Sequence, residues 1–353
     1  MIFLRQFLNV IIVLLICAPW ERTEAFQLDL DSKLKSENGA WYFNDSKFIS
    51  GKGVPVHESL ILKSVLAANL PQLNDEEKVN LIEDLVIGVR WNDDPLQMFR
   101  QDILGGALTF KHSCKKDIAE KVDSEWDLHY RTHCGDMQFL HAMASSESEV
   151  AADTYKKMIA WMEYSYRVAT GSLHGDLYFK GVHYRMTGEN AKIFKSIMLE
   201  GNPKRKMWRA DGLFSLKCKR RSDLKCEQIP FSQETTRNIA LGSLLHVLQD
   251  SFSRSHTARN SSGELLYFGF YNDQRQILHN ALDREYVPPT EIELINISAK
   301  IIEAVVNDRY RDYPFDKVIR TELDSWGEVS KEVIVPALRP VRMESKATDL
   351  GLM

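Results

Sequence analysis

The chain lacks several features that would indicate other classes of protein. After its N-terminal segment it has no uninterrupted stretch of the about 18 apolar residues that a membrane-spanning helix needs. Its formal net charge of -4 is close to balance, so its overall field does not indicate a nucleic-acid-binding protein. It has no internal repeat and no low-complexity tract, and the strict alternation of polar and apolar residues that is typical of half-buried strands is scarce. These absences favour one globular domain that is all-α or nearly so.

The N-terminal segment has the pattern of a secretory signal peptide. Arg5 lies near the start, Val10 to Ala18 form an apolar run, and residues 23–25 (Thr-Glu-Ala) offer a small-x-small cleavage site. The apolar run is too short for a comfortable transmembrane helix; an uncleaved anchor is the alternative. We therefore expect a signal peptide over residues 1–25, a single mature domain over 26–353, and secretion to an extracellular or periplasmic location.

Cysteine is scarce, and no two cysteines have the tight C-x2-C spacing of many structural zinc sites. An even number remains in the mature chain, which suggests two disulfides in an exported protein. Of the three possible connectivities we predict the local one, Cys114–Cys134 and Cys218–Cys226. A structural zinc held by all four thiolates is the disfavoured alternative.

Apolar residues recur with helical spacing in several segments. An acidic first turn after Asn74 and a polar start at Ser232 are typical of helix N-termini. Residues 27–53 are polar and rich in Gly, Asn and Ser, and they indicate a loop. The helices are expected at 56–69, from 74 to about 91, and at 148–169, 232–251, 274–286, 290–307 and 320–335.

Two stretches of the chain space His and Asp so that they could hold metal ions. His246, Asp250 and His256 form H-x3-D-x5-H, and after 22 residues His279 and Asp283 form a second H-x3-D. Residues four apart share one face of a helix, so each pair can point at one ion. Imidazole and carboxylate are the ligands that zinc takes when thiolates are absent. Five such donors exceed what one closed tetrahedral site requires, so we expect more than one ion.

The run from His246 to His256 resembles the core ligand motif of the zinc-dependent phospholipase C / S1–P1 nuclease superfamily. The pair His279 and Asp283 resembles the last ligand pair of that family. Members are helical, exported proteins that hold three zinc ions at the base of a cleft. The resemblance therefore implies a multi-helix domain with two to three zinc ions and further ligands upstream.

Three upstream residues match those further ligands. Asp93 ends a Trp-Asn-Asp sequence that resembles the W-x-D element of the family, with Asp94 as the alternative. His141 ends a Phe-Leu-His sequence that resembles the apolar-Leu-His element, with His133 as its competitor. His57 is the only histidine before Asp93, and it opens a predicted helix as the first histidine of the family does. Two further carboxylates in this region, Asp127 and Asp136, could contact the metal ligands without binding the metal themselves.

The sequence also departs from the family pattern. The mature chain of family members begins with a Trp whose amino group and carbonyl bind zinc, whereas the predicted start here is Phe26. The spacings from Asp93 to His141 and from His141 to His246 are longer than in compact members. Those stretches hold the cysteines, so we interpret about 96–135 and 171–231 as disulfide-bearing insertions.

The resemblance implies a zinc-activated water that attacks a phosphate ester. Asp250 is the expected bridging ligand, and Asp93 is expected to help orient or deprotonate the water, which makes these two the candidate catalytic residues. Arg254 and Arg259 flank His256 and could bind the phosphate; two solvated charges are the alternative.

Three functions are compatible with this pattern. The first is a phospholipase C that cleaves the glycerol-side phosphoester of phospholipids at a membrane surface, because residues 249–253 (Gln-Asp-Ser-Phe-Ser) resemble a bacterial zinc phospholipase branch. The second is an S1/P1-type single-strand nuclease or 3'-nucleotidase, because the spacing and final Asp of the last pair resemble the nuclease side. The third is a secreted helical binding protein with structural metal only. No obligate protein partner is implied.

Overall fold

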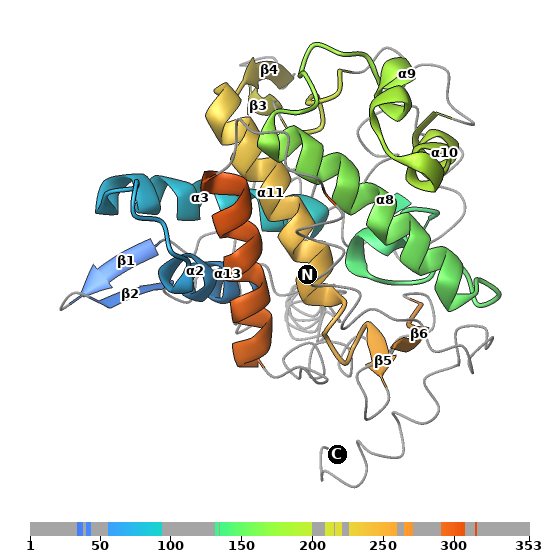
Figure 1. Cartoon of the computed structure of the whole chain (residues 1–353), viewed down its shortest axis with the longest axis horizontal. Coiled ribbons are helices and arrows are strands. Elements are labelled where there is room, and N and C mark those ends of the chain that lie inside the picture. The colour runs from blue at the N-terminus through green and yellow to red at the C-terminus, as the bar shows by residue number, and fades with distance from the viewer. Residues whose placement is uncertain are drawn as a thin grey trace, which may run out of the picture.

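The computed structural model describes residues 34–37, 40–43, 56–93, 131–133, 135–199, 209–214, 216–220, 226–259, 265–270, 291–307 and 315. This part of the chain is mostly helical, as predicted (Figure 1). The signal peptide and the helices expected at 274–286 and 320–335 lie outside the described residues. Within the described ranges, no helix combines the length and the apolar character needed to cross a membrane.

The longer helices begin and end close to the predicted positions. Four of them form the body of the fold: α2 (Val56–Ala67), α3 (Asp75–Asp93), α8 (Ala151–Thr170) and α11 (Gln233–Asp250). The others are α13 (Glu291–Asn307), α10 (Gly188–Leu199), and the short α9 (Phe179–Val182), η1 (Gln138–His141) and η2 (His183–Arg185).

Three short antiparallel hairpins accompany the helices, which is compatible with the expected domain that is all-α or nearly so. They are β1 (Leu34–Glu37) with β2 (Ala40–Phe43), β3 (Leu216–Arg220) with β4 (Cys226–Pro230), and β5 (Thr257–Arg259) with β6 (Leu265–Phe268). The first contradicts the loop predicted over 27–53. Strands of three to five residues are too short for alternation to stand out from chance.

The β3–β4 hairpin carries two of the predicted disulfide cysteines. Its register places Cys218 opposite Gln228 and Cys226 opposite Arg220, so the two cysteines are diagonal neighbours, two positions apart in register. Their pairing stays a prediction, and Cys114 and Cys134 lie outside the described residues.

Polar caps explain where two of the central helices begin. The Asn74 side chain accepts a hydrogen bond from the Glu77 amide at 3.0 Å, and the Glu77 carboxylate accepts one from the Asn74 amide at 2.8 Å. This reciprocal pair satisfies two amides that a helix start leaves without helical partners. At the start of α11, the Ser232 hydroxyl accepts from the Thr235 amide at 3.0 Å.

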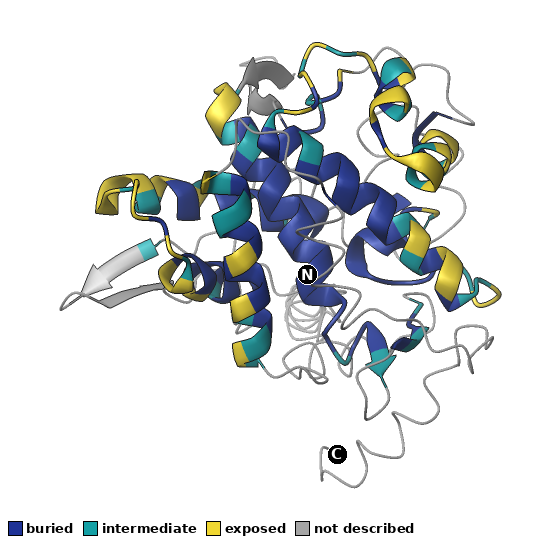
Figure 2. Cartoon of the chain, viewed as in Figure 1, coloured by how far each residue is buried: buried dark blue, intermediate teal, exposed yellow. Residues whose placement is uncertain are grey.

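Helix α11 is the centre of the fold. It is buried along almost its whole length (Figure 2) and packs against both α3 and α8. A Cβ atom on Gly88 of α3 would lie 2.3 Å from the carbonyl oxygen of Ile239, and one on Gly242 of α11 would lie 2.3 Å from that of Leu85. The two helices therefore cross backbone against backbone, because no larger side chain fits at either glycine.

A hydrogen-bond network fixes the end of α3 against three other elements. The Asn92 amide group donates to the Leu140 carbonyl at 2.9 Å and to the Ser243 carbonyl at 3.3 Å, and it accepts from the Ser243 hydroxyl at 2.6 Å. The indole of Trp161 donates to that hydroxyl at 3.2 Å. The network thereby joins α3, η1, α11 and α8 around the residue that precedes Asp93.

Candidate metal centre

The structure brings together six of the eight predicted ligands. All six are buried, and they come from four helical elements and the turn after α11. They are His57 on α2, Asp93 on α3, His141 on η1, His246 and Asp250 on α11, and His256. His279, Asp283 and the alternative carboxylate Asp94 lie outside the described residues.

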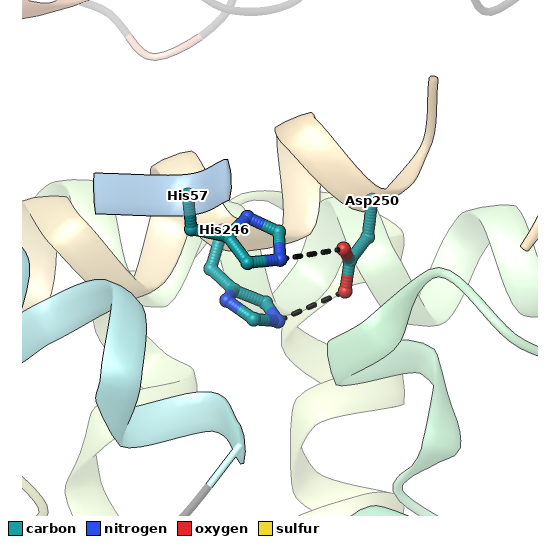
Figure 3. Close-up of side chains that lie close together, drawn as sticks. All are labelled: His57, His246 and Asp250. Carbon is teal, nitrogen blue, oxygen red and sulfur yellow. Dashed lines mark ion pairs between the residues drawn. The ribbon is translucent and has the colours of Figure 1, made fainter. Parts of the chain in front are cut away.

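The carboxylate of Asp250 lies at the centre of the first group of donors. Its Oδ1 atom is 3.3 Å from Nε2 of His57, and its Oδ2 atom is 2.9 Å from Nε2 of His246 (Figure 3). Oδ2 also lies 3.3 Å from Nδ1 of His141 and 3.7 Å from Nδ1 of His256. The two oxygens thus face different imidazoles, which is the arrangement a carboxylate needs to bridge two cations.

A second group of donors shares His246 with the first. Nδ1 of His141 is 3.7 Å from Oδ1 of Asp93, and Nδ1 of His246 is 3.8 Å from Oδ2 of Asp93. Nδ1 of His141 is also 3.1 Å from Nε2 of His246. The ligand atoms of His57, His246 and Asp250, and likewise those of Asp93, His141 and His246, lie within 4.8 Å of one another. Each group could hold a metal ion.

The spacing of the donors fits a small divalent cation. Zinc–ligand bonds of 2.0–2.1 Å in a tetrahedron place the ligand atoms about 3.3 Å apart. The separations given above, from 2.9 to 3.8 Å, lie around this value. Nitrogen and carboxylate oxygen donors without thiolate are compatible with zinc.

Neighbouring acceptors fix the orientation of two imidazoles. Nδ1 of His57 lies 2.7 Å from the amide oxygen of Gln249, and Nδ1 of His256 bonds the backbone carbonyl of His141. Both oxygens can only accept, so both Nδ1 atoms donate and each Nε2 atom keeps its lone pair. This support from outside the ligand shell is typical of metal-binding histidines.

Burial and mutual contacts set the protonation of the cluster. Burial lowers the pKa of His246, and it lowers that of His141 well below its ordinary value, with the neighbouring histidines contributing to both shifts. Burial alone would raise the pKa of Asp250, but His246, His256 and His57 outweigh it, so this pKa lies well below the ordinary value. Neutral imidazoles at His141 and His246 beside an ionised Asp250 are the forms that bind a cation.

His141 and His133, the alternative to it in the sequence, lie side by side. The rings of His133 and His141 have centroids 4.8 Å apart, and the Thr132 hydroxyl lies 2.8 Å from Nδ1 of His133. Of the two, His141 is the one whose imidazole lies beside the carboxylates of Asp93 and Asp250, and His133 packs against the ring of His141. Asp136 instead accepts two hydrogen bonds from Arg131, at 2.5 and 2.7 Å. Asp127 lies outside the described residues.

The arginines predicted to bind phosphate differ in their surroundings. Arg259 donates to the Ser251 carbonyl at 3.1 Å, and its guanidinium lies 4.5 Å from the centroid of the Phe252 ring. These contacts hold the β5 strand against the turn that carries His256. Arg254 is half-buried. Burial raises the pKa of Tyr267, and the positive charge of Arg254 opposes this shift in part.

Sequence reasoning did not identify Gln249 and Asn92 as part of the site. Each directly precedes a predicted ligand in the chain, but their partners, His57 and the Leu140 and Ser243 carbonyls, are distant in sequence. Only their position next to Asp250 and Asp93 could have drawn attention to them.

Comparisons of the chain with protein-family models, with curated proteins and with solved structures give no match.

Proposed function

We propose that this protein is an exported zinc-dependent hydrolase of phosphate esters, similar to the zinc phospholipases C and S1–P1 nucleases, with a membrane phospholipid as its substrate. The observation that carries the proposal is the convergence of six buried histidine and aspartate side chains from separate elements. The sequence spacing of His246, Asp250 and His256 supports the choice of family.

The number and arrangement of donors favour a catalytic site over a structural one. A structural zinc site is closed by four protein ligands. Here the two oxygens of Asp250 face different imidazoles, and His246 belongs to two donor groups. A carboxylate whose two oxygens face different imidazoles suits neighbouring ions, which are typical of phosphoesterases, whereas the neutral imidazole of His246 has one free lone pair and would bind one ion.

The residues have distinct roles in this proposal. When bound, closely spaced zinc ions lower the pKa of a water toward about 7 and neutralise charge on phosphate oxygens. Asp250 would bridge the two donor groups, and His57, His141, His246 and His256 would each offer one neutral imidazole nitrogen to an ion. The carboxylate of Asp93, at the end of α3, orients the attacking water and accepts its proton. Burial of all these groups strengthens their electrostatic interactions.

Phospholipid is the first choice of substrate, and single-stranded nucleic acid is the second. The residues around Asp250 favour the phospholipase. The 22-residue gap before the final His279-x3-Asp283 pair favours the nuclease. Both substrates are phosphodiesters, so the same ligand set would serve either reaction.

The decisive experiment measures hydrolysis by the zinc-loaded mature protein. Phosphocholine release from phosphatidylcholine vesicles and cleavage of single-stranded DNA are followed in parallel, each with a chelator control. We expect chelator-sensitive lipid cleavage that Asp250→Asn reduces by at least about a thousandfold. Asp153→Asn, an exposed aspartate in the first turn of α8, is the matched control and should keep its activity.

The possible outcomes separate the alternatives. Cleavage of DNA alone would move the protein to the nuclease branch. A fully active and correctly folded Asp250→Asn variant would overturn the proposed mechanism. Absence of activity on both substrates, with about one zinc per chain, would favour structural metal only.

A further inference from the structure

Exposed tyrosines gather on one short segment of the described chain. The exposed large hydrophobic side chains of that part are Leu66, Tyr178, Tyr184 and Ile292. The two tyrosines fall within residues 178–195, which span α9, η2 and the first part of α10, and Tyr184 is 79% exposed. Figure 2 shows that much of the surface of these helices is exposed. A tyrosine ring with a polar tip suits an interface between water and an apolar phase.

The same segment is basic. Its exposed charged side chains are four cations, Lys180, Arg185, Lys192 and Lys195, and one anion, Glu189. The carboxylate of Glu189 lies 3.3 Å from the ammonium group of Lys156 on α8. Helix α10, which carries Lys192 and Lys195, packs against both α9 and η2. The cations of α10 therefore lie near the short segment that carries the tyrosines.

We infer that residues 178–195 form a docking surface for a membrane that contains anionic phospholipid. Lysine and arginine are attracted to anionic headgroups, and tyrosine enters the headgroup layer. The inference rests on the proposed function, since it concerns how the protein reaches its lipid substrate.

Both tyrosine rings of this surface have a neighbouring side chain. The ring centroids of His183 and Tyr184 are 3.9 Å apart, and the Lys180 ammonium group lies 5.5 Å from the centroid of the Tyr178 ring. A ring with one open face can still stack on a base, so the choice of a membrane over single-stranded nucleic acid follows from the proposed lipid substrate. The vesicle and DNA measurements below decide between the two.

The docking surface is connected to the candidate metal centre through a short chain of contacts. The guanidinium of Arg131 donates to the Ile197 carbonyl, near the end of α10, at 2.9 Å. His133, two residues after Arg131, packs its ring against His141. These contacts link α10 to the segment that packs His133 against His141.

The test measures binding of the zinc-loaded protein to phosphatidylcholine vesicles with and without phosphatidylglycerol, by flotation at several salt concentrations. Parallel measurements in the Asp250→Asn background exclude changes caused by hydrolysis. We expect tighter, salt-sensitive binding to the anionic vesicles. The double variant Lys180→Ala/Lys195→Ala should weaken it by roughly tenfold or more, and Tyr184→Ser should weaken it several-fold.

Matched controls come from α2 and α13. Lys63→Ala/Lys300→Ala removes two exposed cations, and Ile292→Ser removes an exposed apolar side chain that is 69% exposed. These variants should bind as the parent protein does. Equal losses in test and control variants would overturn the inference, as would binding to single-stranded DNA but not to vesicles.

Hydrolysis of the soluble diester bis(p-nitrophenyl) phosphate separates the two proposals. Diester hydrolysis without selective vesicle binding would reject the docking surface alone. Selective vesicle binding without hydrolysis of any phosphodiester would reject the proposed function and leave the lipid-binding surface in place.

Discussion

Gln249 accepts a hydrogen bond from His57 at 2.7 Å, although 192 positions of the chain separate the two residues. The bond joins the first turn of α2 to the last turn of α11. It also determines which nitrogen of His57 faces Asp250. A residue that is not itself a predicted ligand therefore sets the orientation of one that is.

Replacement of Gln249 should weaken metal binding without removing a ligand. We expect Gln249→Leu to lower zinc affinity by about 10- to 100-fold, because His57 loses the acceptor that fixes its ring. Gln249→Glu keeps an acceptor and should recover much of the affinity. Competition with a chromophoric chelator measures the effect, with Gln72→Leu at an exposed turn as the control. Unchanged affinity in Gln249→Leu would contradict the positioning role.

Removal of metal should destabilise the protein. A ligand that binds only the folded state at 100 times its Kd adds about 2.7 kcal/mol to the free energy of unfolding. We therefore expect chelation to lower the Tm by several degrees and zinc to restore it, as followed by circular dichroism.

The same experiment on His246→Gln tests the assignment of the shared ligand. The zinc-dependent change in Tm should shrink strongly, because His246 belongs to both donor groups. His174→Gln, at an exposed histidine, should keep the full change. An equal response in both variants would show that zinc stabilises the protein from another site.

Stability of the metal-free protein should fall in mild acid. The folded-state pKa values of His141 and His246 lie below the unfolded value, which is about 6.5. The unfolded state therefore takes up protons first as the pH falls through 6.5, and each histidine removes up to about 1.4 kcal/mol of stability per pH unit. The stability that depends on neutral His141 and His246 is fully present above about pH 6.5. The depressed pKa of Asp250 adds a further loss below about pH 4.

Urea denaturation of chelated protein between pH 7.5 and 4.5 measures this slope. His246→Gln should flatten it, whereas His174→Gln should leave it unchanged. A stability that does not vary between pH 7 and 5 would contradict neutral, buried histidines.

The contact between α3 and α11 should tolerate no side chain at its two glycines. We expect Gly88→Ala or Gly242→Ala to destabilise the protein by about 3 kcal/mol or more, because the added methyl group meets backbone atoms that cannot move aside. Gly181→Ala is the control, since its Cβ would meet only the end of the Leu177 side chain, at 3.0 Å. Equilibrium denaturation compares the three variants, and equal small effects would contradict a tight crossing.

Local signals predicted five of the described helices, α2, α3, α8, α11 and α13, but not α10, which lies in the segment interpreted as an insertion. The starts of α3 and α11 follow from Asn74 with Glu77 and from Ser232, because a cap acts within a few residues. The arrangement of His246 and Asp250 follows from helical periodicity in the same way, and their 2.9 Å contact agrees with it. Local physics determined these features, so a single sequence was sufficient.

Contacts between distant segments could not be predicted in this way. The position of His133 behind His141 depends on how the turn at 131–133 packs. The contacts of Arg259 depend on the β5–β6 hairpin, which the short strands concealed. For His57, Asp93 and His141, only resemblance to a family suggested a common site, because nothing in their local sequence encodes their distance from α11.

The paired glycines also offer a way to recognise related chains whose overall sequences have diverged. Gly88 precedes Asp93 by five positions, and Gly242 precedes His246 by four, so each glycine lies about one helical turn ahead of a candidate ligand. The interhelical distance at the crossing controls how far apart those ligands lie. Selection on the site should therefore act on both glycines together, and a search for G-x4-D followed by G-x3-H-x3-D would detect this shared constraint where ordinary similarity is too weak.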